Sequence, residues 1–270
     1  IGAFKLRGAY TMVARLPEAD RARGVITYSS GNHAQAVAFA ARAFGVPAVI
    51  VMPVTAPPIK IEGTRRLGGE VVLEGRTSEE RKVLAERIRA ERDLVMIPPF
   101  DHPDIIAGQG TVGLEILEDW PDVETILVPI GGGGLIGGVA VAVKAERPDV
   151  RVVGVEPTGA PSMRRALDAG GPVTLDGTDS IADGLLPTRV GDLTFAHCRD
   201  LVDDVVLVDD DAIRDAAARL LVRGKLLAEY SGAATTAAAL AAGAARGRTA
   251  AVISGGNIDP SRIGELLAAR

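Results

Sequence analysis

Residues 124–138 have the sequence ETILVPIGGGGLIGG, in which an apolar, β-branched run is followed by four consecutive glycines. The run Thr125–Ile130 predicts a buried parallel strand, and Leu135–Lys144 predicts a helix. Because glycines have no Cβ, the N–H groups of Gly131, Gly132, Gly133 and Gly134 can converge where the helix N-terminus adds partial positive charge. This geometry predicts a turn that binds a phosphate or another anion. A tight, closely packed turn without a ligand explains the glycines as well, and the stretch lacks the Lys-Ser/Thr pair of a P-loop.

The composition is that of a globular protein with a sizeable core. The chain has 270 residues, 47% of them hydrophobic, and its net charge of −5 comes from both signs mixed along the sequence. No basic stripe indicates a nucleic-acid partner, and no apolar run reaches the roughly 20 residues of a membrane span. Cys198 is the single cysteine, so no intramolecular disulfide is possible and a reducing, cytoplasmic setting is expected.

Predicted strands alternate with predicted helices along the chain. This alternation indicates an α/β fold with open, mostly parallel twisted sheets flanked by helices, either one sheet or two. Strands are expected at 24–28, 48–52, 70–73, 94–97, 125–130, 150–155 and 250–253. Helices are expected at 9–22 and, as one long element, at 209–228, whereas 171–200 is expected to be irregular. Polar or Gly-rich segments follow the strands that end at 28, 130 and 253, and parallel sheets bind ligands at the carboxyl ends of their strands.

Lys5 is the first candidate for chemistry. It lies in a largely uncharged stretch with Arg7 as its only charged neighbour. A nucleophilic lysine must lose its proton near neutral pH, and burial lowers the pKa of an amine. Lys5 considered alone fits a surface lysine in a frayed terminus at least as well.

The segment Ser29-Ser30-Gly31-Asn32-His33 is the second candidate. It places hydroxyls, an amide and an imidazole at the start of a predicted helix, where free N–H groups can hold a carboxylate. An ordinary N-cap explains the same residues. The spacing predicts no Ser-His-Asp triad, and His33, His102 and His197 form no metal-ligand pattern.

Several motifs in one order resemble a known family. GAFKLRGA at 2–9 is similar to the Schiff-base lysine motif of fold-type II pyridoxal-phosphate enzymes, whose fold is that of the tryptophan synthase β chain. SSGNH at 29–33 resembles the substrate loop of that family, and GGGG at 131–134 its phosphate cup. SGGN at 254–257 resembles the loop beneath the pyridine nitrogen, while AGQGT at 107–111 and IADG at 181–184 match further signatures. The resemblance is closest to threonine dehydratases and serine racemases and runs almost end to end.

This resemblance implies a role for each matching residue. Lys5 would carry pyridoxal 5′-phosphate and move a proton at the substrate Cα, and Ser30 would face the opposite side of Cα. Ser29, Ser30, Gly31, Asn32 and His33 would bind the substrate, and Asn32 would also contact the 3′ oxygen of the cofactor. The cofactor would further be held by Gly131, Gly132, Gly133 and Gly134 at its phosphate, by Ser254 at its pyridine nitrogen, and by Gly184.

Three departures from the family pattern limit the comparison. Members have about fifty further residues before the lysine motif, a number in line with domain sizes. Racemases of the family bind a divalent cation through a Glu, a backbone carbonyl and an Asp; Glu156 and Ala160 match, but Ser162 replaces the Asp, which weakens affinity for Mg²⁺ or Ca²⁺. The sequence after residue 253 is too short for the regulatory domain of the biosynthetic dehydratases, so feedback by isoleucine is not expected. Arg81 lies where some members place a carboxylate-binding arginine, and a solvated helix face explains it equally.

We therefore expect two open, mostly parallel twisted sheets flanked by helices. They would belong to a small substrate-binding domain over 23–100 and a large cofactor-binding domain formed by 1–22 and 101–270, with the cofactor between them. The expected activity is deamination of L-threonine and L-serine to a 2-oxo acid and ammonia by β-elimination of water. Serine racemase with side dehydratase activity is the alternative enzyme, and a non-catalytic pyridoxal-phosphate- or nucleotide-binding module is the alternative from another class. The expected partners are a small hydroxy-amino acid and further copies of the chain, as a dimer or tetramer.

Overall fold

The computed structural model describes residues 1–29, 31–56, 58–75, 78–241 and 243–268. It divides into two compact units, one made of residue 1 with 3–99 and the other of residue 2 with 100–270. This division differs from the expected one, because residues 3–22 belong to the first unit. Helix α1 (Lys5–Arg15) packs against α3 (Asn32–Ala43), which explains the difference.

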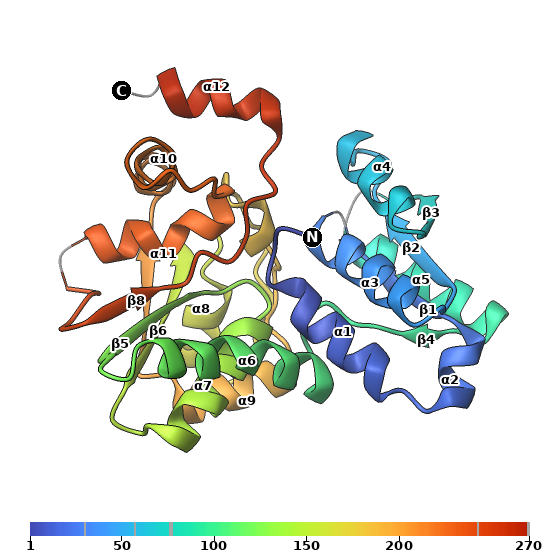
Figure 1. Cartoon of the computed structure of the whole chain (residues 1–270), viewed down its shortest axis with the longest axis horizontal. Coiled ribbons are helices and arrows are strands. Elements are labelled where there is room, and N and C mark those ends of the chain that lie inside the picture. Colours follow the sequence, from blue (N-terminus) through green and yellow to red (C-terminus); the bar gives the residue numbers. More distant parts are fainter. Residues whose placement is uncertain (30, 57, 76–77, 242, 269–270) are drawn as a thin grey trace. The chain divides into compact units, whose positions relative to one another are not determined.

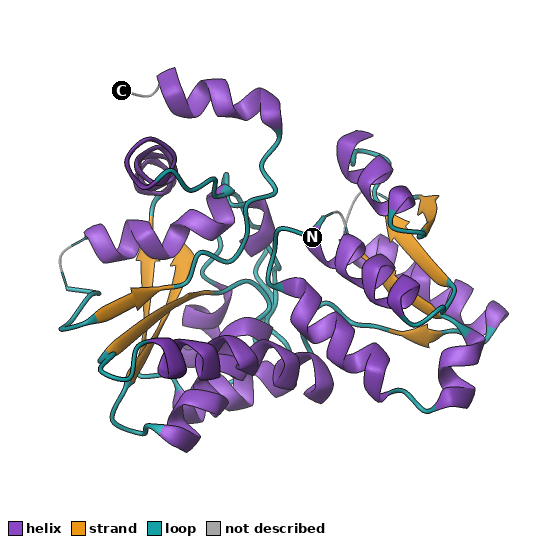
Figure 2. Cartoon of the chain, viewed as in Figure 1, coloured by secondary structure: helices purple, strands orange, loops and turns teal. Residues whose placement is uncertain are grey.

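The first unit contains a four-stranded sheet with the order β3-β2-β1-β4, and all three strand pairs are parallel (Figures 1 and 2). Its strands are β1 (Val25–Tyr28), β2 (Ala48–Met52), β3 (Glu70–Leu73) and β4 (Val95–Met96). Its other helices are α2 (Glu18–Arg23), α4 (Pro58–Arg66) and α5 (Ser78–Arg92). The expected helix over 9–22 is two helices, because Pro17 disfavours helical backbone at Leu16.

Alternate residues of β2 face the two sides of this sheet. Val49 and Val51 pack with Leu84 and Ile88 of α5. Ile50 faces the other side, since a Cβ at Gly69 would lie 3.1 Å from the Ile50 side chain and 3.3 Å from Ala38 of α3. The sheet is therefore covered on both faces, as the continuous apolar sequence AVIVM of β2 requires.

The second unit contains a parallel sheet with the order β7-β6-β5-β8. Its strands are β5 (Thr125–Pro129), β6 (Arg151–Pro157), β7 (Asp204–Val208) and β8 (Thr249–Ala251). Its helices are α6 (Pro103–Asp119), α7 (Gly134–Glu146), α8 (Ser162–Ala169), α9 (Asp192–Leu201), α10 (Asp210–Arg219), α11 (Tyr230–Leu240) and α12 (Pro260–Ala268), with a 3₁₀ turn η1 (Asp183–Leu185) and a π-helical turn η2 (Leu220–Gly224). The expectation of two parallel α/β sheets is confirmed.

Helices also cover both faces of the second sheet. Leu127, Val153 and Val155 form a core with the alanine-rich faces of α10 and α11. A Cβ at Gly154 would lie 3.0 Å from Ile136 of α7, so α7 covers the opposite face. Apolar packing therefore fixes both β5 and α7, so the loop that joins them has fixed ends.

The second unit holds the main errors of the sequence prediction. The segment expected to be irregular contains α9, and β7 was not expected at all. The long helix expected over 209–228 is shorter in the structure. The α-helical part α10 ends at Arg219 and is followed by the π-helical turn η2, and Lys225, with a φ of 57°, ends the helical backbone.

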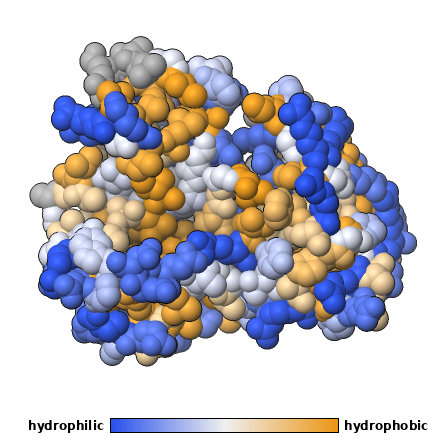
Figure 3. All heavy atoms as spheres, viewed as in Figure 1, coloured by the Kyte–Doolittle hydropathy of each residue, from blue (hydrophilic) through white to orange (hydrophobic). Residues whose placement is uncertain are grey.

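The surface of the second unit exposes several large apolar side chains. Leu226, Leu227 and Leu240 are 51%, 47% and 59% exposed. Figure 3 shows apolar side chains gathered around α11 and α12 on the face that it draws. Among the described residues, no helix is long and apolar enough to cross a membrane.

Candidate active site

Lys5 is the first residue of α1 and is not part of a frayed terminus. Its Nζ donates a hydrogen bond of 2.7 Å to the carbonyl oxygen of Pro99 and lies 5.2 Å from the centroid of the Phe4 ring. The residue keeps some exposure, but burial of its amino group lowers the pKa from 10.5 to about 8. No acidic residue lies in the first turn of α1 to hold the proton. Lys5 therefore has the properties of an amine that acts as a nucleophile near neutral pH.

The segment 29–33 leads from β1 into α3. The hydroxyl of Ser29 accepts a hydrogen bond of 3.3 Å from the N–H of Gly31, which is the N-cap residue of α3. Among the described residues no side chain caps α3, and the first backbone bond of the helix runs from the Gln35 N–H to the Gly31 carbonyl at 3.3 Å. This end of α3, which begins with Asn32 and His33, is suited to bind a carboxylate. Ser30, predicted to face the substrate, lies outside the described residues.

His33 is 3% exposed, and its ring is fixed in one tautomer. The Nε2 atom lies 3.0 Å from the carbonyl oxygen of Ile97, which can only accept, so Nε2 carries the hydrogen. Burial first, and the charge of Lys5 second, lower the pKa of His33 to about 3, so the ring is neutral. Nδ1 is a buried acceptor that has no partner within the described chain. Because the ring has no free N–H, His33 can contribute to carboxylate binding through its backbone N–H.

The glycine loop follows β5 and opens α7. A Cβ would lie 2.2 Å from the Phe100 ring if built on Gly132, 2.9 Å from the Gly184 carbonyl oxygen on Gly131, and 2.8 Å from the Thr194 hydroxyl on Gly133. Gly133 also has a φ of 94°, which favours glycine. Close packing therefore accounts for the glycines sterically. Within the described part of the chain, the N–H groups of residues 131–134 donate to no other residue. These four donors therefore remain for an anion.

The two other predicted cofactor contacts lie on ordered segments of the same unit. Gly184 is in η1, where its N–H donates to the Ser231 hydroxyl at 2.8 Å, and its carbonyl oxygen borders Gly131. Ser254 follows β8 and is 7% exposed. The loop after it is fixed by hydrogen bonds from the Glu229 N–H to the Gly255 carbonyl and from the Gly256 N–H to the Gly2 carbonyl.

Glu156, a predicted metal ligand, uses its carboxylate to cap α8. It accepts bonds of 2.7 and 2.9 Å from the N–H groups of Met163 and Arg164 and one of 3.3 Å from the Ser162 hydroxyl. Burial raises the pKa of Glu156 to about 7 despite these bonds. Among the described residues, no group of three His, Cys, Asp or Glu side chains is arranged to hold a metal ion. Ala160 is fully buried beside this cap.

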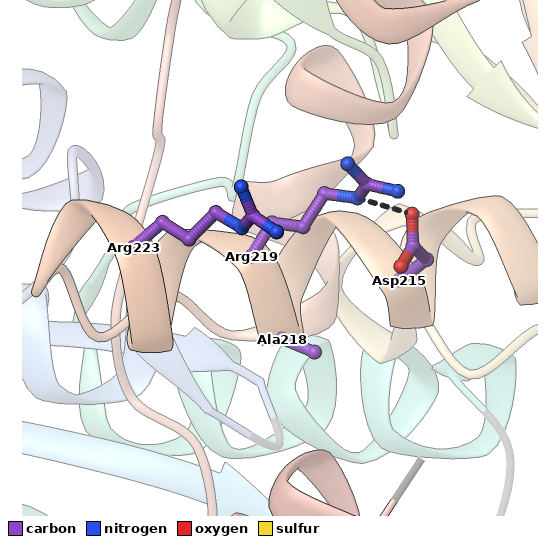
Figure 4. A pocket seen from close by; sticks show the side chains of 4 residues that line it. All are labelled: Asp215, Ala218, Arg219 and Arg223. Atoms are coloured by element: carbon purple, nitrogen blue, oxygen red, sulfur yellow. Dashed lines mark hydrogen bonds and ion pairs between the residues drawn. The ribbon is translucent and has the colours of Figure 1, made fainter. Parts of the chain in front are cut away.

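Arg81, the other candidate carboxylate ligand, is a 7% exposed residue of α5 and not the solvated residue considered from the sequence. A surface hollow of about 210 Å³ lies elsewhere, along α10 and η2, and is lined by Asp215, Ala218, Arg219 and Arg223 (Figure 4). Within this hollow, Arg219 forms an ion pair with Asp215 of the same helix, with 2.6 Å between Nε and Oδ2. This hollow contains none of the predicted site residues.

The structure also reveals two residues that the sequence did not single out. Asp101 and Thr194 hold the glycine loop from outside, through the start of α9. Gly191-Asp192-Leu193-Thr194 is a plausible helix start followed by apolar Phe195 and Cys198, and this signal could have revealed the helix.

Comparisons with known proteins identify the class that this fold and these residues define. The family model described as pyridoxal-phosphate dependent enzyme matches residues 1–255. The chain is a member of this family.

The relatives carry two kinds of name. The chain is 48% identical over 267 residues to an L-threonine ammonia-lyase of Thermotoga maritima, covering 98% of this chain and 67% of that enzyme. It is 44% identical over 265 residues to a serine racemase of Oryza sativa, covering 96% of this chain and 78% of that enzyme. Among solved structures, the processed form of threonine deaminase isoform 2 from Solanum lycopersicum has a TM-score of 0.93 at 41% identity and covers 100% of this chain and 80% of its own.

Proposed function

We propose that this protein is a pyridoxal-phosphate-dependent ammonia-lyase that converts L-threonine and L-serine to a 2-oxo acid and ammonia. The observation that carries the proposal is the desolvated amino group of Lys5, with its pKa lowered to about 8, at the position of the family's Schiff-base lysine. The 48% identity to an L-threonine ammonia-lyase supports the choice of reaction.

The described residues fit the chemical groups of pyridoxal 5′-phosphate. Lys5 supplies an amine that can bond covalently to the aldehyde, and the N–H groups of Gly131–Gly134 supply donors for the phosphate. Ser254 would supply a hydroxyl for the pyridine nitrogen and Asn32 an amide for the 3′ oxygen, while Gly184 borders the glycine loop. When bound, the cofactor supplies an electron sink that makes the substrate Cα–H acidic.

Lys5 Nζ acts as the general base that takes the proton from Cα. A lysine with a pKa of about 8 has an appreciable neutral fraction at physiological pH, which this role requires. The β-hydroxyl leaves with a proton as water. Hydrolysis of the resulting enamine then consumes one water, so each amino acid gives one 2-oxo acid and one ammonia.

Ser254 biases the outcome toward elimination. A neutral hydroxyl does not hold a proton on a pyridine nitrogen as a carboxylate would. Charge is therefore less delocalised from Cα, which favours rapid loss of the β-substituent over transamination.

The substrate carboxylate binds at the N-terminus of α3. Ser29, Gly31, Asn32 and the backbone N–H of His33 provide the contacts, together with Ser30. The helix dipole adds partial positive charge there, and the neutral His33 ring brings no competing charge.

Serine racemase activity is the second candidate, since the rice relative has that name and Ser30 stands at the position that serves the opposite face of Cα. A cation bound by Glu156 and Ala160 would accompany it. The engagement of both Glu156 oxygens by α8 favours the lyase, because a metal would have to replace those hydrogen bonds.

The test incubates purified protein and pyridoxal 5′-phosphate with L-threonine and with L-serine, with and without Mg²⁺ or a chelator. We expect a 2-oxo acid in stoichiometric yield with ammonia, no D-amino acid and no chelator effect. D-serine as the main product would support the racemase. No product, in a protein that binds the cofactor, would support a non-catalytic module.

We further propose that the chain self-associates as a dimer or tetramer. The exposed leucines Leu226, Leu227 and Leu240 provide apolar surface for such contacts. Light scattering on the eluted protein gives the mass directly.

A further inference from the structure

The carbonyl oxygen of Gly132 is held by the start of α9. The Thr194 hydroxyl lies 2.7 Å from this oxygen, and the Gly191 N–H donates to it at 3.3 Å. Thr194 is fully buried. Its hydroxyl also lies 3.1 Å from the Gly191 carbonyl, but it has a single hydrogen and the Gly132 contact is the shorter.

Asp101 in turn fixes the start of α9. Its Oδ1 accepts from the N–H groups of Leu193 at 3.0 Å and Thr194 at 3.1 Å, and its Oδ2 from Asp192 at 3.1 Å. The carboxylate therefore occupies the N-terminus of α9, whose free N–H groups it satisfies. By contrast, among the described residues no hydrogen bond uses the N–H groups of the glycine loop, in which α7 begins.

These bonds set the direction of a donor in the loop. In a trans peptide the C=O and N–H groups point in opposite directions, and the described chain has no cis peptide. Holding the Gly132 carbonyl toward α9 therefore turns the Gly133 N–H away from α9. Gly133 also lies directly against Thr194, since a Cβ built on it would be only 2.8 Å from the Thr194 hydroxyl.

We propose that Thr194 and Asp101 are positioning residues that orient the glycine loop for a phosphate monoester. This inference rests on the proposed function and deepens it. Thr194 aligns the Gly133 N–H through the Gly132 carbonyl, and Asp101 holds Thr194 in place. Neither side chain touches the phosphate. Their effect is therefore specific to ligands that carry one.

The experiment compares two aldehydes, pyridoxal 5′-phosphate and pyridoxal, which lacks the phosphate. Their dissociation constants are measured by absorbance titration of cofactor-free wild-type protein and of Thr194→Val, Thr194→Ser and Thr125→Val. Thr125 is the matched control, because its buried hydroxyl also donates to a carbonyl, that of Arg246 at 2.8 Å, at the other end of β5.

We expect Thr194→Val to weaken binding of pyridoxal 5′-phosphate about tenfold, the effect of one lost hydrogen bond, and to leave pyridoxal within about twofold. Thr194→Ser restores phosphate binding, and Thr125→Val leaves the ratio of the two constants unchanged. An equal loss for both aldehydes, or no loss, in Thr194→Val would overturn the positioning role.

A second variant keeps the test decisive if Thr194→Val does not fold. Asp101→Asn retains one acceptor oxygen, so we expect a smaller loss that is again confined to pyridoxal 5′-phosphate. An unchanged ratio in that folded variant overturns the proposal. If the wild-type protein binds neither aldehyde covalently, the proposed function itself fails. If the wild type binds both aldehydes but the variants leave the ratio of the two constants unchanged, only the positioning role fails.

Discussion

The lowered pKa of Lys5 gives a prediction that needs no cofactor. At pH 7 an amine with a pKa of about 8 is about one-tenth neutral, whereas an amine at 10.5 is about 0.03% neutral. Only the neutral form attacks electrophiles, so Lys5 gains about 300-fold in reactive fraction from its surroundings. The cause is burial of the amino group without an acidic partner in its helical turn.

Competitive labelling with trace acetic anhydride measures this directly. The chain has five lysines, and each peptide can be quantified by mass spectrometry as a function of pH. We expect labelling of Lys5 to rise about tenfold per pH unit up to about pH 8 and then to level off, with exposed Lys225 as the internal reference. A Lys5 labelling curve that keeps rising past pH 10 would refute the account of its environment.

The same shift affects stability in a defined direction. Between pH 8 and 10.5 the unfolded chain binds a proton at Lys5 that the folded chain has lost, so stability rises with pH across this window. Below pH 8 both states are protonated and the folded state bears the cost of a desolvated ammonium. Lys5→Met should therefore stabilise the cofactor-free protein below pH 8, and this gain should shrink toward pH 10.5 in urea titrations.

Three further predictions concern packing and buried polar groups. Gly138→Ala places a Cβ 2.2 Å from a backbone carbonyl of α6 and should cost about 1–3 kcal/mol in urea unfolding, whereas Gly171→Ala, which meets no atom within 4 Å, should not. Glu156→Gln leaves one N–H of α8 facing an amide donor, and a loss of about 1–3 kcal/mol is expected; an unchanged melting temperature would contradict this cap. His33 has a folded pKa of about 3, so protonation of the unfolded chain reduces stability as pH falls from 6.5 to 3, by up to about 1.4 kcal/mol per unit. The free energy of unfolding of His33→Gln should fall less between pH 6.5 and 4.5 than that of the wild type, and an equal fall in both proteins would contradict this shift.

The sequence predicted well those features that depend on local chemistry. The β5–α7 junction lies where the apolar run meets the glycines, because a strand without alternation must be buried and four residues without Cβ end it. Lys5 and the SSGNH segment were located by motif, and the family match confirms the class of enzyme to which they point. Their roles in catalysis stay predictions until tested.

Features that depend on contacts between distant segments were not predicted. Thr194 matters through a bond to a residue 62 positions away, and nothing in its own neighbourhood indicates that partner. The turn η2 interrupts a periodic helical sequence, and a long-range bond from the Glu229 N–H to the Gly255 carbonyl fixes the chain beyond it. By contrast, the break at Pro17 follows from a local rule and could have been predicted.

The attachment point of the cofactor tests the central claim most directly. The protein is incubated with pyridoxal 5′-phosphate, reduced with borohydride, digested and mapped by mass spectrometry. We expect the pyridoxyl phosphate label on the peptide that contains Lys5, and no label in Lys5→Ala. A label confined to Lys60, Lys82, Lys144 or Lys225, or none at all, would contradict the assignment of Lys5 as the residue that binds the cofactor.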